Sequence, residues 1–351
     1  MRYSELGRTG ENVSRVGLGT MMYGSQVEAA QAHRQMDYAL ERGINLFDTA
    51  EAYSVPPRPE TYGRTEEIIG DWFAAGGRRD KVFLATKIAG TGAAFPGGID
   101  WMREGGAQTR VTAQQVAHAV ENSLRRLRTD AIDLYQIHWP DRDVNRWGTL
   151  QHVDYDLAFE PFEAQLEALA RQVEAGRIRY VGVSNETPWG VMRFLAAADK
   201  YGLPRIVSIQ NAYSLVNRTF ELGLSEIALH ENVGLLAYSS LGQGYLTGKY
   251  RGGALPEGSR KALYQRLGRY EKVRADEAID AYLDLAASFG MAPASFAYRW
   301  ADSKPWVTST LIGASSMEQL AADIDAFDLP WTAQMDAAVD ALHNRQPNPC
   351  P

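Results

Sequence analysis

The 351-residue sequence contains a single cysteine, Cys350. One cysteine excludes a disulfide framework within the chain and any zinc site built on several thiolates. No apolar run approaches the ~18 residues that a membrane-spanning helix needs, and residues 1–10 lack the apolar segment of a secretory signal. We therefore expect a soluble, cytoplasmic protein with no membrane partner.

An excess of basic residues is also missing. The formal net charge is −7 and the sequence pI is about 5.5. Nucleic acids and anionic membranes attract basic surfaces, so we expect neither as the main partner. Such mild acidity is ordinary for a soluble protein, and it indicates neither a particular partner nor an oligomeric state.

Several motifs of metal and nucleotide chemistry are absent or incomplete. The sequence has no H-x-H or H-E-x-x-H, so a metal-dependent hydrolase would lack its ligands, and we expect no metal. In residues 17–24 the third glycine comes two residues too late for the dinucleotide-binding G-x-G-x-x-G. Residues 182–186 lack the final glycine of a nucleophile elbow.

Short apolar runs, by contrast, are abundant and alternate with helical patterns. The runs are rich in valine, isoleucine and leucine, as in strands covered on both faces. Between them the apolar residues recur at helical spacing; Val116, Val120, Leu124 and Leu127, for example, share one helix face. The predicted strands span residues 16–21, 45–50, 82–88, 132–138, 180–185, 206–211, 235–239 and 309–314.

Eight strand–helix units in series predict a parallel α/β sheet. Their even spacing favours closure into a (β/α)8 TIM barrel over a doubly wound open sheet. Residues 7–10 predict an N-terminal β-hairpin, and residues 332–343 an extra C-terminal helix. No linker-like change in composition divides the chain, so residues 1–351 are expected to form a single domain.

Long connections follow several of the predicted strands. Loops of this length in a compact domain are usually lids, binding loops or disordered segments. The carboxyl ends of the strands form the functional face of a barrel, so these loops are expected to surround the site. They span residues 54–65, 89–110, 139–159 and 240–270.

Four reactive residues lie at or just after predicted strand ends: Asp48, Tyr53, Lys87 and His138. A lysine ending an apolar strand should be partly desolvated and should attract a carboxylate such as Asp48. A lysine cation near a tyrosine lowers the pKa of the phenol from about 10, which would let Tyr53 donate a proton near neutral pH. His138 would then help to hold the oxygen that is protonated.

Each of the four residues also has a structural explanation. An aspartate at a strand end is commonly a cap or turn former, and a lysine there can extend to solvent. A lone histidine is more often structural than catalytic, and Tyr53 could simply pack in the core. Their combination at one rim is what favours a site.

Short motifs occur in a fixed order over nearly the whole chain. They include Gly17-Leu-Gly-Thr20, Phe47-Asp-Thr-Ala50 followed by Tyr53, Ala85-Thr-Lys87, Gln136-Ile-His138, Gly182-Val-Ser-Asn185, Ile209-Gln-Asn211 and Ile312-Gly-Ala-Ser315. This ordered set resembles the aldo-keto reductase family. The resemblance is strongest to its bacterial Tas-type branch, which is related to potassium-channel β-subunits.

The resemblance implies NADPH-dependent reduction of a small-molecule aldehyde or ketone. It implies that Tyr53 is the proton donor, that Lys87 and Asp48 tune it, and that His138 orients the substrate. The substrate pocket would involve Tyr23 and Trp139 beside Tyr53 and His138. The residues implied to bind NADP(H) are Gly19, Thr20, Met21, Asp48, Ser184, Asn185, Gln210 and Tyr238 at the nicotinamide end; Ser239, Ser240, Leu241, Gly242, Gln243, Gly244, Leu246 and Gly248 at the pyrophosphate; and Lys249, Arg260, Gly313, Ser315, Gln319 and Asp323 towards the adenosine and its 2′-phosphate.

Asp323 departs from the family pattern, which usually has asparagine at this position. A carboxylate accepts a hydrogen bond from the adenine amino group but cannot donate one to a ring nitrogen. We therefore expect the adenine contacts to differ from those of the family.

Two other functions are compatible with the sequence. The chain could be a cofactor-binding module that reports redox state to a partner, with incidental turnover. It could also be a barrel lyase or isomerase in which Lys87 forms a Schiff base.

Overall fold

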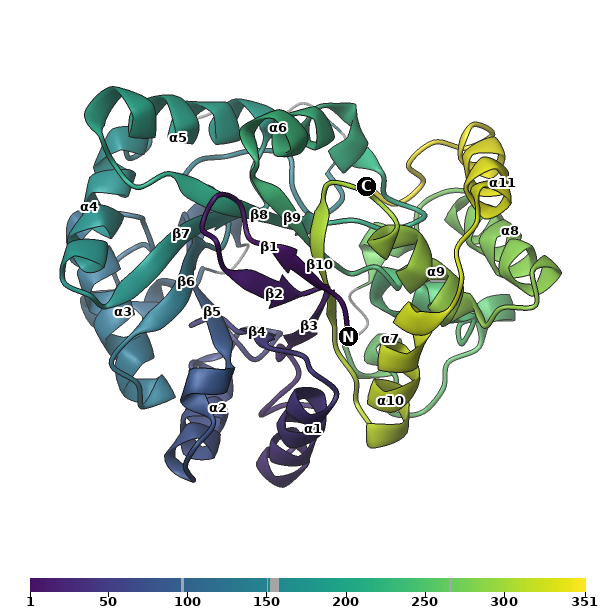
Figure 1. Ribbon diagram of the computed structural model, residues 1–351, viewed down its shortest axis with the longest axis horizontal. Coiled ribbons are helices and arrows are strands. Elements are labelled where there is room, and N and C mark those ends of the chain that lie inside the picture. Colours follow the sequence, from purple (N-terminus) through teal and green to yellow (C-terminus); the bar gives the residue numbers. More distant parts are fainter. Residues whose placement is uncertain (96–97, 150, 152–157, 265–266) are drawn as a thin grey trace.

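The centre of the molecule is a closed parallel barrel (Figure 1). The computed structural model describes residues 1–95, 98–149, 151, 158–264 and 267–351. The barrel strands are β3 (Val16–Gly19), β4 (Leu46–Asp48), β5 (Phe83–Ile88), β6 (Ile132–Ile137), β7 (Ile178–Ser184), β8 (Ile206–Ala212), β9 (Gly234–Tyr238) and β10 (Val307–Ile312). Each pairs with the next, and β10 pairs with β3 to close the barrel. The predicted (β/α)8 barrel is confirmed and the open sheet is excluded.

The predicted strands are correct in place but differ at their ends. Strand β4 ends at Asp48, whereas the apolar pattern extended it to residue 50. Strand β7 begins at Ile178, two residues earlier than predicted. His138 lies just after β6, and its backbone N–H donates to the carbonyl of Ile88, 2.8 Å away. These ends matter because they set which side chains reach the rim of the barrel.

A hairpin of β1 (Tyr3–Glu5) and β2 (Asn12–Ser14) covers one opening of the barrel (Figure 1). Leu6 and Val13 from this hairpin are fully buried, in one apolar cluster with residues of the barrel interior such as Leu46 and Leu236. The hairpin therefore closes the barrel opposite the carboxyl ends of the strands, and the predicted hairpin is confirmed.

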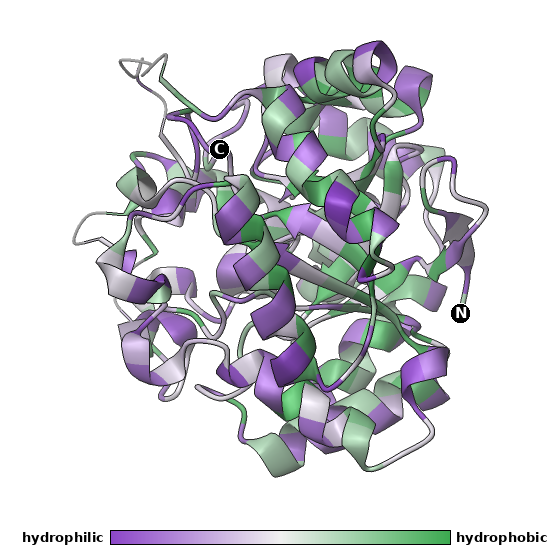
Figure 2. Cartoon of the chain, turned by 90° about the vertical axis from the view of Figure 1, so that its left-hand side faces the viewer, coloured by the Kyte–Doolittle hydropathy of each residue, from purple (hydrophilic) through white to green (hydrophobic). Residues whose placement is uncertain are grey.

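Amphipathic helices surround the barrel and bury one side against it. In Figure 2 the helices carry both hydrophobic and hydrophilic residues, as helices with one buried face do. The hydroxyl of Thr187 accepts from the N–H of Gly190 at the start of one helix, which ends at Gly202 with a left-handed backbone (φ 64°). The helices are α1 (Ala29–Glu41), α2 (Arg64–Ala74), α3 (Ala113–Leu127), α4 (Phe162–Glu174), α5 (Pro188–Tyr201), α6 (Leu224–Glu231), α7 (Arg260–Tyr264), α8 (Ala275–Ser288), α9 (Pro293–Asp302), α10 (Met317–Asp325) and α11 (Ala333–His343).

Helix α11 is the predicted extra C-terminal helix, and it lies beside α8 (Figure 1). The long connections contain short helical turns, including α7 and a 3-10 turn at Gly242–Thr247. Residues 96–97, 150, 152–157 and 265–266 of the predicted loops lie outside the described residues. Among the residues that the structure describes, no helix is long and apolar enough to cross a membrane.

Candidate active site

Asp48 and Lys87 form a buried ion pair at the carboxyl ends of β4 and β5. The Lys87 Nζ atom lies 2.6 Å from Asp48 Oδ2 and also donates to the carbonyl of Thr49, 2.7 Å away. Burial lowers the pKa of Lys87, and the neighbouring Asp48 carboxylate opposes that shift. The predicted contact between these two residues is confirmed.

The other Asp48 oxygen accepts hydrogen bonds from two glutamine amides. Gln210 Nε2 lies 2.8 Å from Asp48 Oδ1, and Gln136 Nε2 lies 3.2 Å from the same atom. The resemblance had implied a nicotinamide contact for Gln210, whereas Gln136 was only part of a motif and received no role. Its signal in the sequence was a glutamine within a buried strand, two residues before His138.

Tyr53 and His138 lie directly beside this ion pair. Their rings make an edge contact with centroids 5.5 Å apart, and Lys87 Nζ lies 4.9 Å from the centroid of the Tyr53 ring. The Tyr53 side chain is buried, with a relative exposure of 8%. The structure thus brings together all four residues of the predicted quartet.

The pKa of Tyr53 is raised well above that of an ordinary phenol. Burial is the largest cause, followed by the charge of Asp48 and by Tyr238, while Arg260 acts in the opposite direction. The expectation of a lowered pKa is therefore wrong, because burial and the charge of Asp48 raise the pKa of Tyr53 more than nearby cations lower it. Tyr53 keeps its proton at neutral pH, which is the form that a proton donor requires.

His138 is held in its neutral form. Burial and the charge of Lys87 lower the pKa of the imidazole well below its usual value. Its Nδ1 atom is buried and has no hydrogen-bond partner within the described part of the chain. A neutral imidazole can donate one hydrogen bond and accept another, so His138 can bind an oxygen beside Tyr53.

The residues implied to hold a nicotinamide are linked by hydrogen bonds. Asn185 has a left-handed backbone (φ 52°), and its amide donates to the carbonyl of His138 at 2.8 Å and to Ser184 Oγ at 3.1 Å. Tyr238 donates to Asn185 Oδ1, 2.5 Å away. The Ser184 hydroxyl donates to the carbonyl of Gln210 at 2.7 Å. The structure therefore brings Ser184, Asn185, Gln210 and Tyr238 together.

The segment after β9 turns tightly through several left-handed residues. Ser239, Gly242, Gln243 and Gly244 have φ values of 56°, 56°, 54° and 100°. At Gly244 a Cβ atom would lie only 2.5 Å from the Cε atom of Lys249, so the glycine leaves room for the lysine side chain. Such a turn can present backbone N–H groups to an anion, with a lysine beside it.

Arg260 lies beside Met21 and Tyr53, at the nicotinamide end of the implied site, whereas the resemblance had implied a position towards the adenosine. Its Nη2 atom is 3.9 Å from the sulfur of Met21, and its charge influences the pKa of Tyr53. Within the described residues the groups that act on its guanidinium are tyrosines rather than carboxylates, and burial lowers its pKa. A largely desolvated cation without a counterion suits a phosphate-bearing group, so the residues present fit a dinucleotide cofactor.

Ser315 and Gln319 lie at the start of α10, and Ser316 caps this helix. The N–H and hydroxyl groups of Ser315 both donate to Gln319 Oε1, at 3.0 and 2.9 Å. At Gly313 a Cβ atom would lie 3.3 Å from the carbonyl oxygen of Gly19, which is a tight contact. These residues therefore fix the first turn of α10 close to β3.

Asp323 is buried, and its carboxyl accepts from the hydroxyl of Tyr298 at 3.4 Å. Burial raises the pKa of Asp323 to about 7, while Tyr298 and the charge of Lys249 oppose the shift. A carboxyl with this pKa is partly protonated at neutral pH and can then donate a hydrogen bond.

An aromatic wall extends from His138 towards solvent. The Trp139 ring lies 4.9 Å from His138, 5.0 Å from Phe95 and 5.8 Å from Trp147, measured between centroids. Phe95 received no role in the sequence analysis. Tyr23 is buried in the main core, and no ring contact joins it to Tyr53 or His138 in the described part of the chain. Trp139 therefore borders the quartet.

Ion pairs with a buried carboxylate link successive loops around this rim, and they were not predicted from the sequence. Each joins the segment after one strand to the segment after the next, beginning at β4 and ending at β7. The partners are distant in sequence, so no local pattern indicates them. The pairs are Glu51–Arg103 (2.8 Å), Arg110–Asp141 (2.9 Å) and Arg142–Glu186 (2.6 Å).

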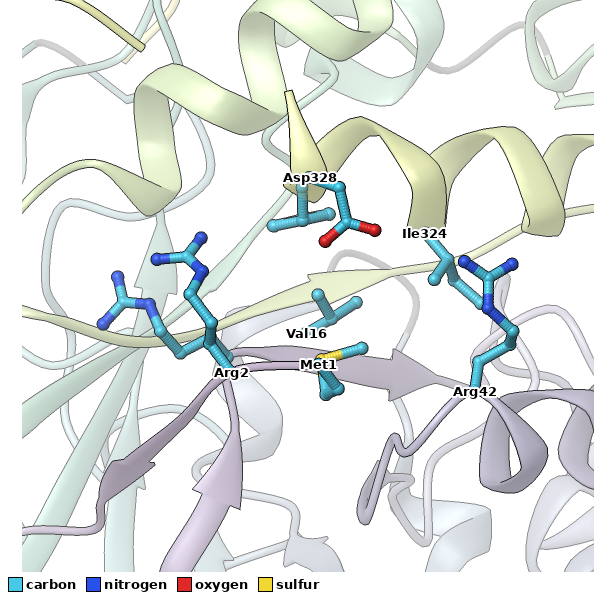
Figure 3. A pocket seen from close by; sticks show the side chains of 8 residues that line it. Met1, Arg2, Val16, Arg42, Ile324 and Asp328 are labelled. Atoms are coloured by element: carbon cyan, nitrogen blue, oxygen red, sulfur yellow. The ribbon is translucent and has the colours of Figure 1, made fainter. Parts of the chain in front are cut away.

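A separate pocket lies at the opposite end of the barrel, beside the N-terminus (Figure 3). Its arginines are already paired, because Arg2 and Arg15 bind Asp302 and Arg42 binds Asp325. These pairs leave none of the three arginines free to attract a ligand, and a pocket at this end of a barrel is typical of a stabilising region. It is lined by Met1, Arg2, Arg15, Val16, Arg42, Ile324, Phe327 and Asp328.

Comparison with known proteins agrees with this geometry. A model of the Aldo/keto reductase family matches residues 15–344. Protein tas of Escherichia coli (strain K12) is 46% identical over 352 residues, which is 100% of both chains. The uncharacterized oxidoreductase YrpG of Bacillus subtilis (strain 168) is 35% identical, covering 94% of this chain and 92% of the relative. A probable voltage-gated potassium channel subunit beta of Arabidopsis thaliana is 27% identical, covering 94% and 92%.

Proposed function

The chain belongs to the aldo/keto reductase family and is an oxidoreductase, and from this premise we propose that it reduces aldehydes or ketones to alcohols with NADPH. The observation that carries the proposal is the protonated, buried Tyr53 beside the Asp48–Lys87 pair and His138. A carbonyl oxygen placed between Tyr53 and the neutral His138 would receive hydrogen bonds from both.

The reaction requires a proton for the carbonyl oxygen and a hydride for the carbonyl carbon. The bound nicotinamide would supply the hydride. The O–H bond of Tyr53 would break as its proton moves to the oxygen, and the Lys87 ammonium, 4.9 Å from the ring centroid, would stabilise the phenolate that remains. His138 would hold the oxygen in place, and Tyr53 would then regain a proton from solvent.

Different residues around the rim would hold the nicotinamide, the pyrophosphate and the 2′-phosphate of the cofactor. Ser184, Asn185 and Gln210 would bind the nicotinamide amide, with Tyr238 against its ring. The left-handed turn at residues 239–248 would bind the pyrophosphate. The cation of Lys249 supports NADPH over NADH, because the extra 2′-phosphate adds negative charge.

Replacement of Tyr53 by phenylalanine tests this assignment. We expect Tyr53→Phe to lower turnover by about 10²–10⁴-fold, the usual contribution of a general acid, with NADPH affinity unchanged. Steady-state NADPH oxidation and fluorescence titration measure the two quantities. Tyr201→Phe, at an exposed tyrosine, is the control. Turnover near the wild-type rate in Tyr53→Phe would show that another group donates the proton.

A second candidate is a cofactor-binding regulatory module, favoured by the similarity to the plant potassium-channel subunits. Tight NADPH binding without turnover of any carbonyl in a broad aldehyde and ketone panel would support it. The Schiff-base alternative is disfavoured, because the Lys87 amine donates its hydrogen bonds to Asp48 and Thr49. An ion-paired ammonium has no free electron pair for attack on a carbonyl carbon.

A further inference from the structure

Gln136 is a fully buried polar residue that the reaction described above does not use. It lies on β6 in register with Lys87 on β5 and with Gly182 on β7. Side chains two residues apart on a strand share a face, so Gln136 points to the same side as His138, one layer deeper in the barrel. It therefore lies beneath the candidate active site.

The Gln136 amide belongs to a closed set of hydrogen bonds around Asp48. Gln136 Nε2 donates to Asp48 Oδ1 at 3.2 Å, and Gln136 Oε1 accepts from Gln210 Nε2 at 3.3 Å. Gln210 also donates to Asp48 Oδ1, and Lys87 donates to Asp48 Oδ2. Both oxygens of the carboxylate are thereby fixed, so its plane cannot rotate without breaking a buried hydrogen bond.

The neighbouring strand leaves room for this glutamine. A Cβ atom at Gly182 would lie 3.2 Å from Gln136 Cγ and 2.7 Å from Ser208 Oγ. A larger residue at position 182 would therefore press on the Gln136 side chain. The glycine and the glutamine fit together as one arrangement within the barrel.

We propose that Gln136 is a positioning residue of the reaction. It holds Asp48, and through Asp48 it holds the Lys87 ammonium beneath the ring of Tyr53, in the orientation that proton donation requires. This inference rests on the proposed function. The charged and titratable groups that face Tyr53 are Asp48, Lys87, His138, Tyr238 and Arg260.

Two substitutions at position 136 distinguish positioning from packing. Gln136→Met keeps the volume and removes the N–H donor, so we expect kcat to fall about tenfold at every pH, with KM for the carbonyl within twofold. Gln136→Glu introduces a carboxyl that donates to Asp48 only when protonated. A carboxyl beside another carboxylate has a raised pKa. We therefore expect near wild-type kcat at acidic pH and progressive loss as the pH rises.

The experiment measures pH profiles of kcat and KM for the wild-type protein and both variants, with thermal unfolding over the same pH range. Gln165→Met, at a buried glutamine of α4 outside this set, controls for the loss of a buried amide. Rescue of Gln136→Glu at acidic pH, with uniform loss in Gln136→Met, supports the proposal. Two results overturn it. One is a wild-type kcat in Gln136→Met. The other is a loss of kcat in both variants that is the same at every pH and matches their loss of thermal stability. Absence of turnover in the wild-type protein would overturn the proposed function itself, and the catalytic role of Gln136 with it.

Discussion

Lys87 Nζ and Asp48 Oδ2 lie 2.6 Å apart, with side-chain exposures of 0% and 3%. Removing one member of a buried pair leaves an uncompensated charge, which costs about 3–5 kcal/mol. We expect Lys87→Met to lower the free energy of unfolding by about this amount. The double variant Asp48→Asn/Lys87→Met should recover most of the loss, because the charge is then absent. Urea unfolding of both variants measures the difference, and a single variant as stable as wild type would contradict this account.

His138 should make stability sensitive to mild acid. The folded pKa is well below the usual 6.5, so the unfolded chain binds a proton first. The stabilisation is present above pH 6.5 and is lost as the pH falls towards the folded pKa, by about 1–2 kcal/mol between pH 6.5 and pH 5. Unfolding of wild type and His138→Gln across this range measures the effect. Equal pH dependence in both proteins would refute it.

Asp323 should have the opposite effect. Its pKa is raised to about 7, so its contribution to stability is fully present below the unfolded value near 3.8 and is lost as the pH rises through 7. Relative to Asp323→Asn, we expect wild type to lose about 2–4 kcal/mol between pH 4 and pH 8. Thermal or urea unfolding at several pH values provides the comparison. A constant difference between the two proteins would show that Asp323 is ionised throughout.

Lys249 should contribute to the choice between the two nicotinamide cofactors. If its ammonium binds the 2′-phosphate, Lys249→Met will weaken NADPH binding about tenfold and leave NADH binding nearly unchanged. Lys261, which is paired with Glu271 at 2.9 Å, offers the control variant Lys261→Met. Fluorescence titration at low and high salt measures both affinities. Equal weakening for NADH and NADPH would place Lys249 at the pyrophosphate they share.

Much of the fold and the central quartet could be predicted, because the signals are local. A buried parallel strand is a short apolar run, and the residue at its carboxyl end lies at the rim whatever the exact register. Asp48, Lys87 and His138 were found in this way. Strand ends were less accurate. Strand β4 ends at Asp48, although the N–H groups of Thr49 and Glu51 still donate to the carbonyls of Ala85 and Lys87 on β5.

The remaining features depend on three-dimensional contacts. Gln136 becomes meaningful only when the barrel places its amide against Asp48, 88 residues away in the chain. The raised pKa of Tyr53 follows from burial and from the charge of Asp48, and a spacing pattern gives neither the burial nor this proximity. Phe95 reaches Trp139 across two loops that show no periodicity.

The ion pairs between successive loops have a consequence for engineering the substrate pocket. A loop exchanged alone with one from a relative would leave its neighbour with a buried, unpaired charge; Glu51 without Arg103 is one case. The segments after β4, β5, β6 and β7 are thus a single transplantable unit. We therefore expect natural variants of these four segments to change both members of an ion pair together. Substrate specificity would then change through several segments at once.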